Sequence, residues 1–387
     1  QYDKDENTSY PGKITANIDP NTGKITIAKA SVTKAPDGTI YQVDEGETVN
    51  PKYENGDVQY HVAAHAVAET QNIPAKAGAN SQRIDNAATV TINPDNGTKT
   101  IASNIPGFAG QSNVPVDQDT GNVVLTPTND VIKGVHFNDD GKDTGSTGNV
   151  PVKGNQNGDI VVTKNTKSTD GKYMIPAGST VTKGSDDNYH GDSFPVNPDG
   201  TINIPNGSYD ASDKTSETGK LIAKVDDNGN MTVAKGSVTK DDKGNVYIAH
   251  SNTPITKSVD QDGNVTYHVN AEKVAQDQSI SAKTGQNGTI TDGAAKIHVN
   301  DDGSKTVVSN VPGFKGYDIP EGQPVPNPVV LTPSAQNING VHMDDINGND
   351  TGETADNLPV IGQDDGSIKT TKSITTPDGK IILANTK

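Results

Sequence analysis

Hydrophobic and polar residues alternate in short runs along most of the chain. One run covers residues 14–18 and another covers residues 58–62. A period of two is the pattern of a strand with one buried face, and the runs favour Val, Ile, Thr and Tyr, as strands do. Turn pairs that accept positive φ separate the runs; examples are Asn55-Gly56, Asn96-Gly97, Asp170-Gly171, Asp199-Gly200, Asn206-Gly207, Asp262-Gly263 and Asp378-Gly379. The pattern predicts an all-β chain.

Two short stretches depart from this alternation. "AAHAVAE" (63–69) and its later counterpart "NAEKVAQ" (270–276) contain good helix formers. We expect a helix of one or two turns at each place, marginal without packing.

The chain contains a long tandem repeat. "ITIAKASVTKAPDGTIY" begins at Ile25 and "MTVAKGSVTKDDKGNVY" begins at Met231, an offset of 206 residues (231 minus 25). "NIPGFAG" and "NVPGFKG" share this offset, and the offset reaches 208 residues at "VPV" (150) and "LPV" (358). Because missed repeats mislead every later step, they set the domain prediction: an N-terminal lead-in at 1–11, a first copy at 12–217 and a truncated second copy at 218–387.

A shorter period runs inside each copy. An acidic Gly turn followed by alternating residues recurs as "DPNTGKITIAK", "NPDNGTKTIAS" and "NQNGDIVVTK", and again in the second copy. It predicts about three small β units per long repeat. The expected fold is a tandem array of small β-rich domains forming an elongated rod. The alternative is a continuous β-solenoid.

Composition supports several thin cores over one large core. Only 30% of the 387 residues are hydrophobic and 4% are aromatic, well below the share usual in globular domains. Disorder is the rival interpretation of so polar a chain, but the regular spacing of β-branched residues argues against it. The absence of Cys excludes disulfides, thiolate metal sites and Cys nucleophiles.

The charge balance narrows the partners. A formal net charge of −17 with a single arginine, Arg83, argues against nucleic acid and anionic membranes, which require clustered positive charge. There is no long apolar run, so no membrane insertion is expected. Acidic chains do attract cations.

No catalytic motif is present. The sequence has no nucleophile elbow, P-loop, dinucleotide fingerprint or HExxH, and the glutamates do not recur between copies, since Glu69 aligns with Gln276. We expect no enzymatic activity.

One repeated acidic stretch is a candidate cation site. "GVHFNDDGKDTG" begins at Gly134 and "GVHMDDINGNDTG" begins at Gly340. Oxygen-bearing side chains at short spacing suit Ca²⁺, the only cofactor predicted. Spacing and charge differ between copies, so we favour an acidic turn. The candidate ligands are Asp139, Asp140, Asp143, Asp345, Asn347, Asn349 and Asp350.

Two further pairs recur. Phe108 and Phe314 lie in the "PGF" of each copy, where a core position is favoured over an exposed aromatic platform for a sugar. His61 and His268 lie in "YHV", where an outward polar position is favoured over a ligand-binding or pH-sensitive one. A Lys–Asn or Lys–Asp isopeptide bond is a further alternative, with Lys34 and Lys240 at matching positions.

The tandem blocks "VTKDDKGNVY", "VPGFKG" and "VVLTP", the Thr/Asn/Asp/Gly style and the lack of Cys resemble repeat regions of large Gram-positive cell-surface adhesins, especially those of lactic-acid bacteria. The resemblance implies a β-rich, extracellular, cell-wall-attached stalk, any anchor of which lies outside this segment. We therefore expect a non-catalytic spacer and display array in adhesion, whose contacts are neighbouring repeats. The alternatives are a module that binds host or microbial glycans or surface proteins, and a surface-layer lattice subunit.

Overall fold

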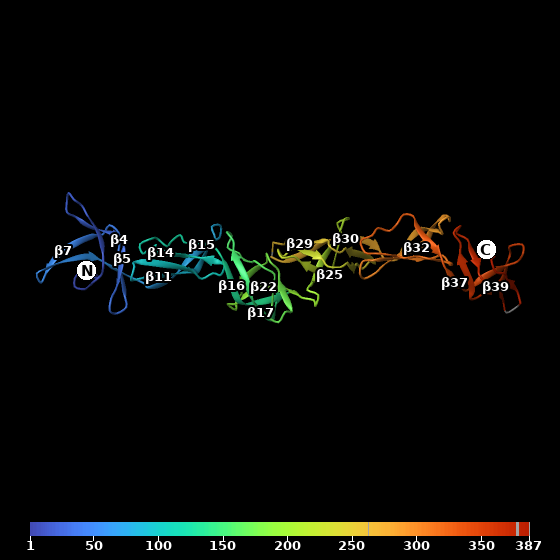
Figure 1. Cartoon of the computed structure of the whole chain (residues 1–387), viewed down its shortest axis with the longest axis horizontal. Coiled ribbons are helices and arrows are strands. Elements are labelled where there is room, and N and C mark those ends of the chain that lie inside the picture. Colours follow the sequence, from blue (N-terminus) through green and yellow to red (C-terminus); the bar gives the residue numbers. More distant parts are fainter. Residues whose placement is uncertain (262, 377–378, 387) are drawn as a thin grey trace. The chain divides into compact units, whose positions relative to one another are not determined.

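The computed structural model describes residues 1–261, 263–376 and 379–386. These residues form strands β1 to β43 and no helix (Figure 1), so the all-β prediction is confirmed. Asp262 and Asp378, each the first residue of a predicted turn pair, lie outside the described residues. The chain divides into two compact units, one of Gln1–Pro195 with Asp227–Gly229 and one of Val196–Asp226 with Asn230–Lys387.

The strands fall into six consecutive stretches, and each described strand pairs only with strands of its own stretch. We call these stretches modules 1 to 6. They cover residues 2–67, 70–127, 129–195, 202–275, 278–333 and 335–382. Among the described residues, no ladder joins a strand of one module to a strand of another. A continuous solenoid would need such ladders between successive turns, so the pairing favours an array of small domains.

Modules 1 and 4 share a topology in which the first strand runs parallel to a late one. In module 1, β1 pairs with β8, and in module 4, β24 pairs with β30. The strands of module 1 are β1 Tyr2–Asp3, β2 Ser9–Tyr10, β3 Thr15–Ile18, β4 Ile25–Lys29, β5 Ser31–Lys34, β6 Ile40–Val43, β7 Thr48–Glu54, β8 Asp57–Ala63 and β9 His65–Val67. Those of module 4 are β24 Ile202–Ala211, β25 Ser216–Val225, β26 Met231–Val233, β27 Ser237–Lys240, β28 Asn245–Ala249, β29 Pro254–Val259 and β30 Val265–Ala275.

The residues of the predicted lead-in take part in the first sheet. Tyr2 is wholly buried, and its hydroxyl donates to the Lys13 carbonyl at 2.9 Å. Tyr209 is wholly buried in module 4 and donates to the Lys220 carbonyl at 2.7 Å. Residues 1–11 therefore have structural counterparts that begin at the end of β24.

Modules 2 and 5 have the same strand order, β13-β15-β10-β11-β12-β14 and β34-β36-β31-β32-β33-β35. The strands of module 2 are β10 Thr70–Ala77, β11 Arg83–Asn93, β12 Thr98–Ser103, β13 Phe108–Ala109, β14 Gln111–Pro115 and β15 Val124–Pro127. Those of module 5 are β31 Gln278–Thr284, β32 Ile290–Val299, β33 Lys305–Ser309, β34 Phe314–Lys315, β35 Asp318–Ile319 and β36 Val329–Pro333.

Modules 3 and 6 differ in closure. Module 3 contains the closed barrel β16-β17-β18-β21-β22, whereas module 6 has open sheets. The strands of module 3 are β16 Asn129–Asp139, β17 Lys142–Gly154, β18 Ile160–Val162, β19 Thr166–Lys167, β20 Tyr173–Ile175, β21 Thr180–Lys183, β22 Tyr189–Asp192 and β23 Phe194–Pro195. Those of module 6 are β37 Ala335–Ile338, β38 Val341–Asp344, β39 Asp350–Ala355, β40 Leu358–Gly362, β41 Ile368–Thr370, β42 Ile374–Thr375 and β43 Ile381–Ile382.

The two predicted helices are wrong. Residues 63–69 hold the end of β8 and the strand β9, and residues 270–275 belong to β30. β9 pairs with β6 through His65, Ala66 and Val67, so the backbone hydrogen bonds of this segment go to a distant strand. A helix of one or two turns gains too few local bonds to compete with such a ladder.

Thin apolar clusters form the core and continue across module boundaries within each unit. In the first unit, Ile92 and Val116 of module 2 pack with Val32 of module 1. A larger cluster combines side chains of modules 2 and 3. In the second unit, Val299 of module 5 packs with Ile248 of module 4. Neighbouring modules therefore share buried surface, which none could bury alone.

Candidate functional site

The repeated His–Asp stretch forms a hairpin in each copy, and the two turns differ. In module 3, Asp140 and Gly141 have φ of 49° and 71° and connect β16 to β17. Positive φ at both central residues defines the tight two-residue turn that matches strand twist. In module 6 the inserted residue opens the connection, and Asp345 closes it with a backbone bond to the Asn349 carbonyl at 2.7 Å.

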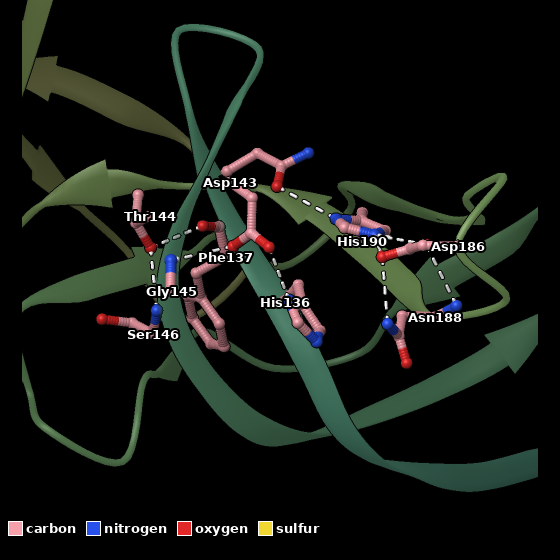
Figure 2. Close-up of polar contacts among 10 residues, drawn as sticks. His136, Phe137, Asp143, Thr144, Gly145, Ser146, Asp186, Asn188 and His190 are labelled. Atoms are coloured by element: carbon pink, nitrogen blue, oxygen red, sulfur yellow. Dashed lines mark hydrogen bonds and ion pairs between the residues drawn. The ribbon is translucent and has the colours of Figure 1, made fainter.

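The hairpin of module 3 places His136 beside a second histidine. β16 and β22 are parallel neighbours in the barrel, and His136 is the register partner of His190. The two ring centroids are 5.0 Å apart. Asp143 on β17 reaches the same point, where its Oδ2 lies 2.7 Å from His136 Nδ1. Figure 2 shows the three side chains converging from three strands.

These three residues are close enough to share one ion. One ligand atom from each of His136, Asp143 and His190 lies within 4.8 Å of the others. No other group of three His, Cys, Asp or Glu residues within the described part of the chain meets this criterion. His136 and His190 are largely shielded, with side chains 24% and 16% exposed, whereas that of Asp143 is 40% exposed.

Neighbouring side chains fix the second histidine. His190 Nδ1 lies 3.1 Å from Asn138 Oδ1, and its Nε2 lies 3.1 Å from Asp186 Oδ1. Asp186 is held in turn by Asn188, whose side-chain amide donates to it at 2.9 Å (Figure 2). Carboxylates that orient an imidazole in this way are typical partners of metal-binding histidines.

The carboxylates of the cluster are held in the ionised form. The Gly145 amide and the His136 ring lower the pKa of Asp143. The Asn188 side chain and His190 lower the pKa of Asp186. Asp139 differs, because burial and the nearby Asp140 raise its pKa. Asp143 and Asp186 are therefore available as anions, the form in which a carboxylate binds a metal.

No three of the candidate Ca²⁺-binding carboxylates, all of them described residues, lie close enough together to share one ion. Asp143 faces two histidines, while Asp139 and Asp140 lie at the turn. In module 6, Asp345 Oδ1 accepts the Asn347 and Asn349 amides, at 2.8 and 2.9 Å. Such bonds are those of a side chain that caps its own turn.

The hairpin of module 6 keeps only the His–Asp pair. His342 Nδ1 lies 2.9 Å from Asp350 Oδ2, with side chains 64% and 52% exposed. The position aligned with His190 falls beyond residue 387 of this sequence.

Phe108 and Phe314 lie in the core, which excludes an exposed sugar platform at these rings. Both are buried, and each lies against a glycine of the following module. A Cβ added to Gly154 would lie 2.5 Å from Phe108 Cζ, and one added to Gly362 would lie 2.5 Å from Phe314 Cζ. The Gly154 amide donates to the Gly107 carbonyl at 2.9 Å. We call this contact the Phe–Gly joint.

His61 is buried, which corrects the outward position favoured from alternation. β1 pairs with β8 and covers it, and Asp3 Oδ1 lies 2.8 Å from His61 Nδ1. The counterpart His268 lies 2.8 Å from Asp210 and is about a third exposed. Both histidines therefore pair with an aspartate on the parallel neighbouring strand.

The lysines proposed for a cross-link differ from those that the structure buries. Lys34 pairs with Glu69 on the surface, and Lys240 is exposed. Lys99 and Lys305 are buried, at an offset of 206 residues (305 minus 99). Lys99 donates to the carbonyls of Val116 and Gln118, while Lys305 pairs with Glu272 at 3.0 Å.

No known protein family matches this sequence, and neither a curated protein nor a solved structure is similar to it. Among the described residues, the structure has no helix with the length and apolarity needed to span a membrane.

Proposed function

We propose that the chain is a non-catalytic repeat segment of a bacterial cell-surface protein, acting as a spacer and display array in adhesion. The observation that carries this proposal is the recurrence of the Phe–Gly joint. The Gly154 amide bonds to the Gly107 carbonyl at 2.9 Å, and the Gly362 amide bonds to the Gly313 carbonyl at the same distance. A spacer needs defined joints between its modules, because freely hinged modules give little reach.

The glycines of the joint explain why it needs this sequence. Gly107 and Gly313 have φ of +79° and +80°, a region that side chains disfavour. A Cβ on either residue would lie 2.7–2.8 Å from the backbone nitrogen of Gly154 or Gly362. The "PGF" of each copy and the glycine of the next module therefore form one interlocking contact, which supports a structural role.

Reach can be tested on a cell surface. An epitope is displayed beyond zero, one or two copies of the segment, and its accessibility to an antibody is measured. A spacer predicts accessibility that rises with each copy. A matched variant with Gly154→Val and Gly362→Val disrupts both joints and should lower the gain. Accessibility that does not change with copy number would contradict the proposal.

A second candidate, a glycan-binding module, is favoured by one exposed aromatic pair. Tyr53 and Tyr60 lie on the β7–β8 hairpin, 84% and 48% exposed. Tyr53 faces Val58 and Tyr60 faces Pro51, so all four side chains share one face. Exposed aromatic rings can stack on sugar faces. Binding on a glycan array that is lost in Tyr53→Ala would support this candidate, and an array without binding would reject it.

A further inference from the structure

Module 3 contains a group of side chains whose chemistry differs from that of the acidic turns elsewhere. Two imidazoles and a carboxylate meet at one point, from β16, β17 and β22. The parallel register of His136 with His190 sets their approach. The hairpin of module 6 offers one imidazole and one carboxylate, from His342 and Asp350.

The donor set selects the kind of ion. Ca²⁺ takes six to eight oxygen ligands, which this group cannot supply. Imidazole nitrogen combined with carboxylate suits Zn²⁺, Cu²⁺ or Ni²⁺, and Zn²⁺ accepts three protein ligands with a water in the fourth position. Ligand atoms around a tetrahedral Zn²⁺ lie roughly 3.3 Å apart, given bonds of about 2.0–2.1 Å. The three ligand atoms lie within 4.8 Å of one another, so the side chains must move closer to bind an ion. His190 must also release one partner, because Asn138 Oδ1 and Asp186 Oδ1 each lie 3.1 Å from one of its nitrogens.

The second copy contains the same His–Asp pair. His342 and Asp350 keep the pairing of His136 and Asp143, at 2.9 Å against 2.7 Å. Thr144 donates to the Phe137 carbonyl at 2.6 Å, as Thr351 does to Met343. The His–Asp pair thus belongs to the hairpin. In module 3 His190 joins this pair, and Asp186 orients its ring at 3.1 Å.

We propose that His136, Asp143 and His190 bind one divalent transition-metal ion of the Zn²⁺ class. Asp186 acts as a positioning residue, since it holds the His190 ring at 3.1 Å. The ion links the β16–β17 hairpin to β22 across the barrel and stabilises module 3, because it binds the folded state and not the unfolded one. The site is independent of the spacer proposal. The spacer proposal holds whether or not the chain binds metal, and the metal site holds whether or not the chain is a spacer.

Calorimetry on the full chain, freed of metal with a chelator, tests the site with ZnCl₂ near neutral pH. The expected result is one strong Zn²⁺ site per chain and no heat from CaCl₂. His190→Ala and His136→Ala should each weaken Zn²⁺ binding at least about tenfold. The matched control His342→Ala removes the equivalent histidine of module 6 and should leave the affinity unchanged.

Two further measurements keep the test decisive. Asp143→Asn preserves the shape of the ligand residue, so weaker binding in this variant does not depend on whether the His→Ala variants fold. Imidazole NMR signals of His136 and His190 should shift on adding Zn²⁺, while that of His342 should not. Absence of Zn²⁺ binding by the parent chain, equal affinity in His190→Ala, or equal weakening in His342→Ala would each overturn the proposal.

Discussion

Modules 3 and 6 contain the same hairpin in two settings. Both pair a histidine with an aspartate, and both bond that aspartate to a backbone amide two residues on, Gly145 at 2.9 Å and Gly352 at 2.8 Å. In module 3 a parallel strand brings His190 against the pair, whereas in module 6 the pair is exposed. The His–Asp pair is therefore common to both hairpins, and in module 3 the strand β22 adds a second imidazole to it.

The Phe–Gly joint, unlike the hairpin, is the same in both copies. Phe108 with Gly154 and Phe314 with Gly362 repeat the same distances. This contact is therefore the same in both copies, although the hairpins of modules 3 and 6 differ. Between the two copies, the buried contacts of the joint are conserved in geometry, whereas the polar residues of the hairpin differ. Substitutions can test this contrast in both copies.

The largest expected effect comes from removing the buried ring of the joint. Phe108→Ala and Phe314→Ala should each lower the local free energy of unfolding by about 3–5 kcal/mol, through lost burial and the cavity left behind. Hydrogen exchange of the flanking strands measures this. Tyr53→Ala, on an exposed ring, is the control and should change stability by less than about 0.5 kcal/mol. A large effect in one copy only would break the equivalence of the joints.

Filling the space over the ring should cost less. Gly154→Ala and Gly362→Ala place a Cβ about 2.5 Å from a carbonyl oxygen and a ring carbon, contacts that backbone shifts only partly relieve. We expect a loss of about 1–3 kcal/mol in each copy, by the same exchange measurement. The control is Gly121→Ala, whose Cβ meets only the flexible Asp119 side chain. A Gly154→Ala variant as stable as this control would contradict the close approach.

The histidines near the start of each copy should differ. His61 is buried against Asp3, whereas His268 is about a third exposed against Asp210. His61→Ala should cost about 1–2 kcal/mol because it leaves Asp3 without a partner, and His268→Ala should cost less than about 1 kcal/mol. Chemical denaturation of the two variants gives the comparison. Equal losses would mean that burial does not set the strength of this pair.

The smallest effect is acid sensitivity of the two hairpins. A backbone amide and a histidine lower the pKa of Asp143 and of Asp350 below the ordinary range. Because the folded-state pKa is the lower one, this contribution is present above about pH 4 and is lost as pH falls through the lowered pKa.

Asn cannot titrate, so Asp143→Asn and Asp350→Asn should each flatten the acid-induced rise in exchange of the hairpin amides. The measurement is made in chelator, so that metal binding does not contribute. Unchanged profiles in both variants would show that these carboxylates do not stabilise the folded hairpins.

The sequence predicts the strands and turns well because each depends on near neighbours. Alternation and Asn-Gly or Asp-Gly pairs place the hairpins, and the repeat offset divides the chain. The helix predictions failed at residues 63–69 because β6, some 25 residues earlier, supplies the competing ladder. The outward position predicted for His61 is wrong for a similar reason, because β1, at the start of the chain, covers this residue.

The candidate site is mostly invisible in the sequence. Asp143 belongs to the predicted acidic set. His136 stands in the "GVH" before that set, and His190 and Asp186 lie about 50 residues further along the chain. The parallel pairing of β16 with β22 unites them, and no local pattern encodes it. The one available signal is the pair of histidines within alternating runs, "GVHF" and "NYHG".

Small-angle scattering of the whole chain tests the spacer most directly. A compact globule of this length has a radius of gyration of about 21 Å. If the chain is a spacer, we expect a radius of gyration at least about twice as large, with the scattering profile of a rod. Chelator should leave this radius unchanged, and disruption of both Phe–Gly joints should lower it. A radius near that of the globule would contradict the spacer proposal.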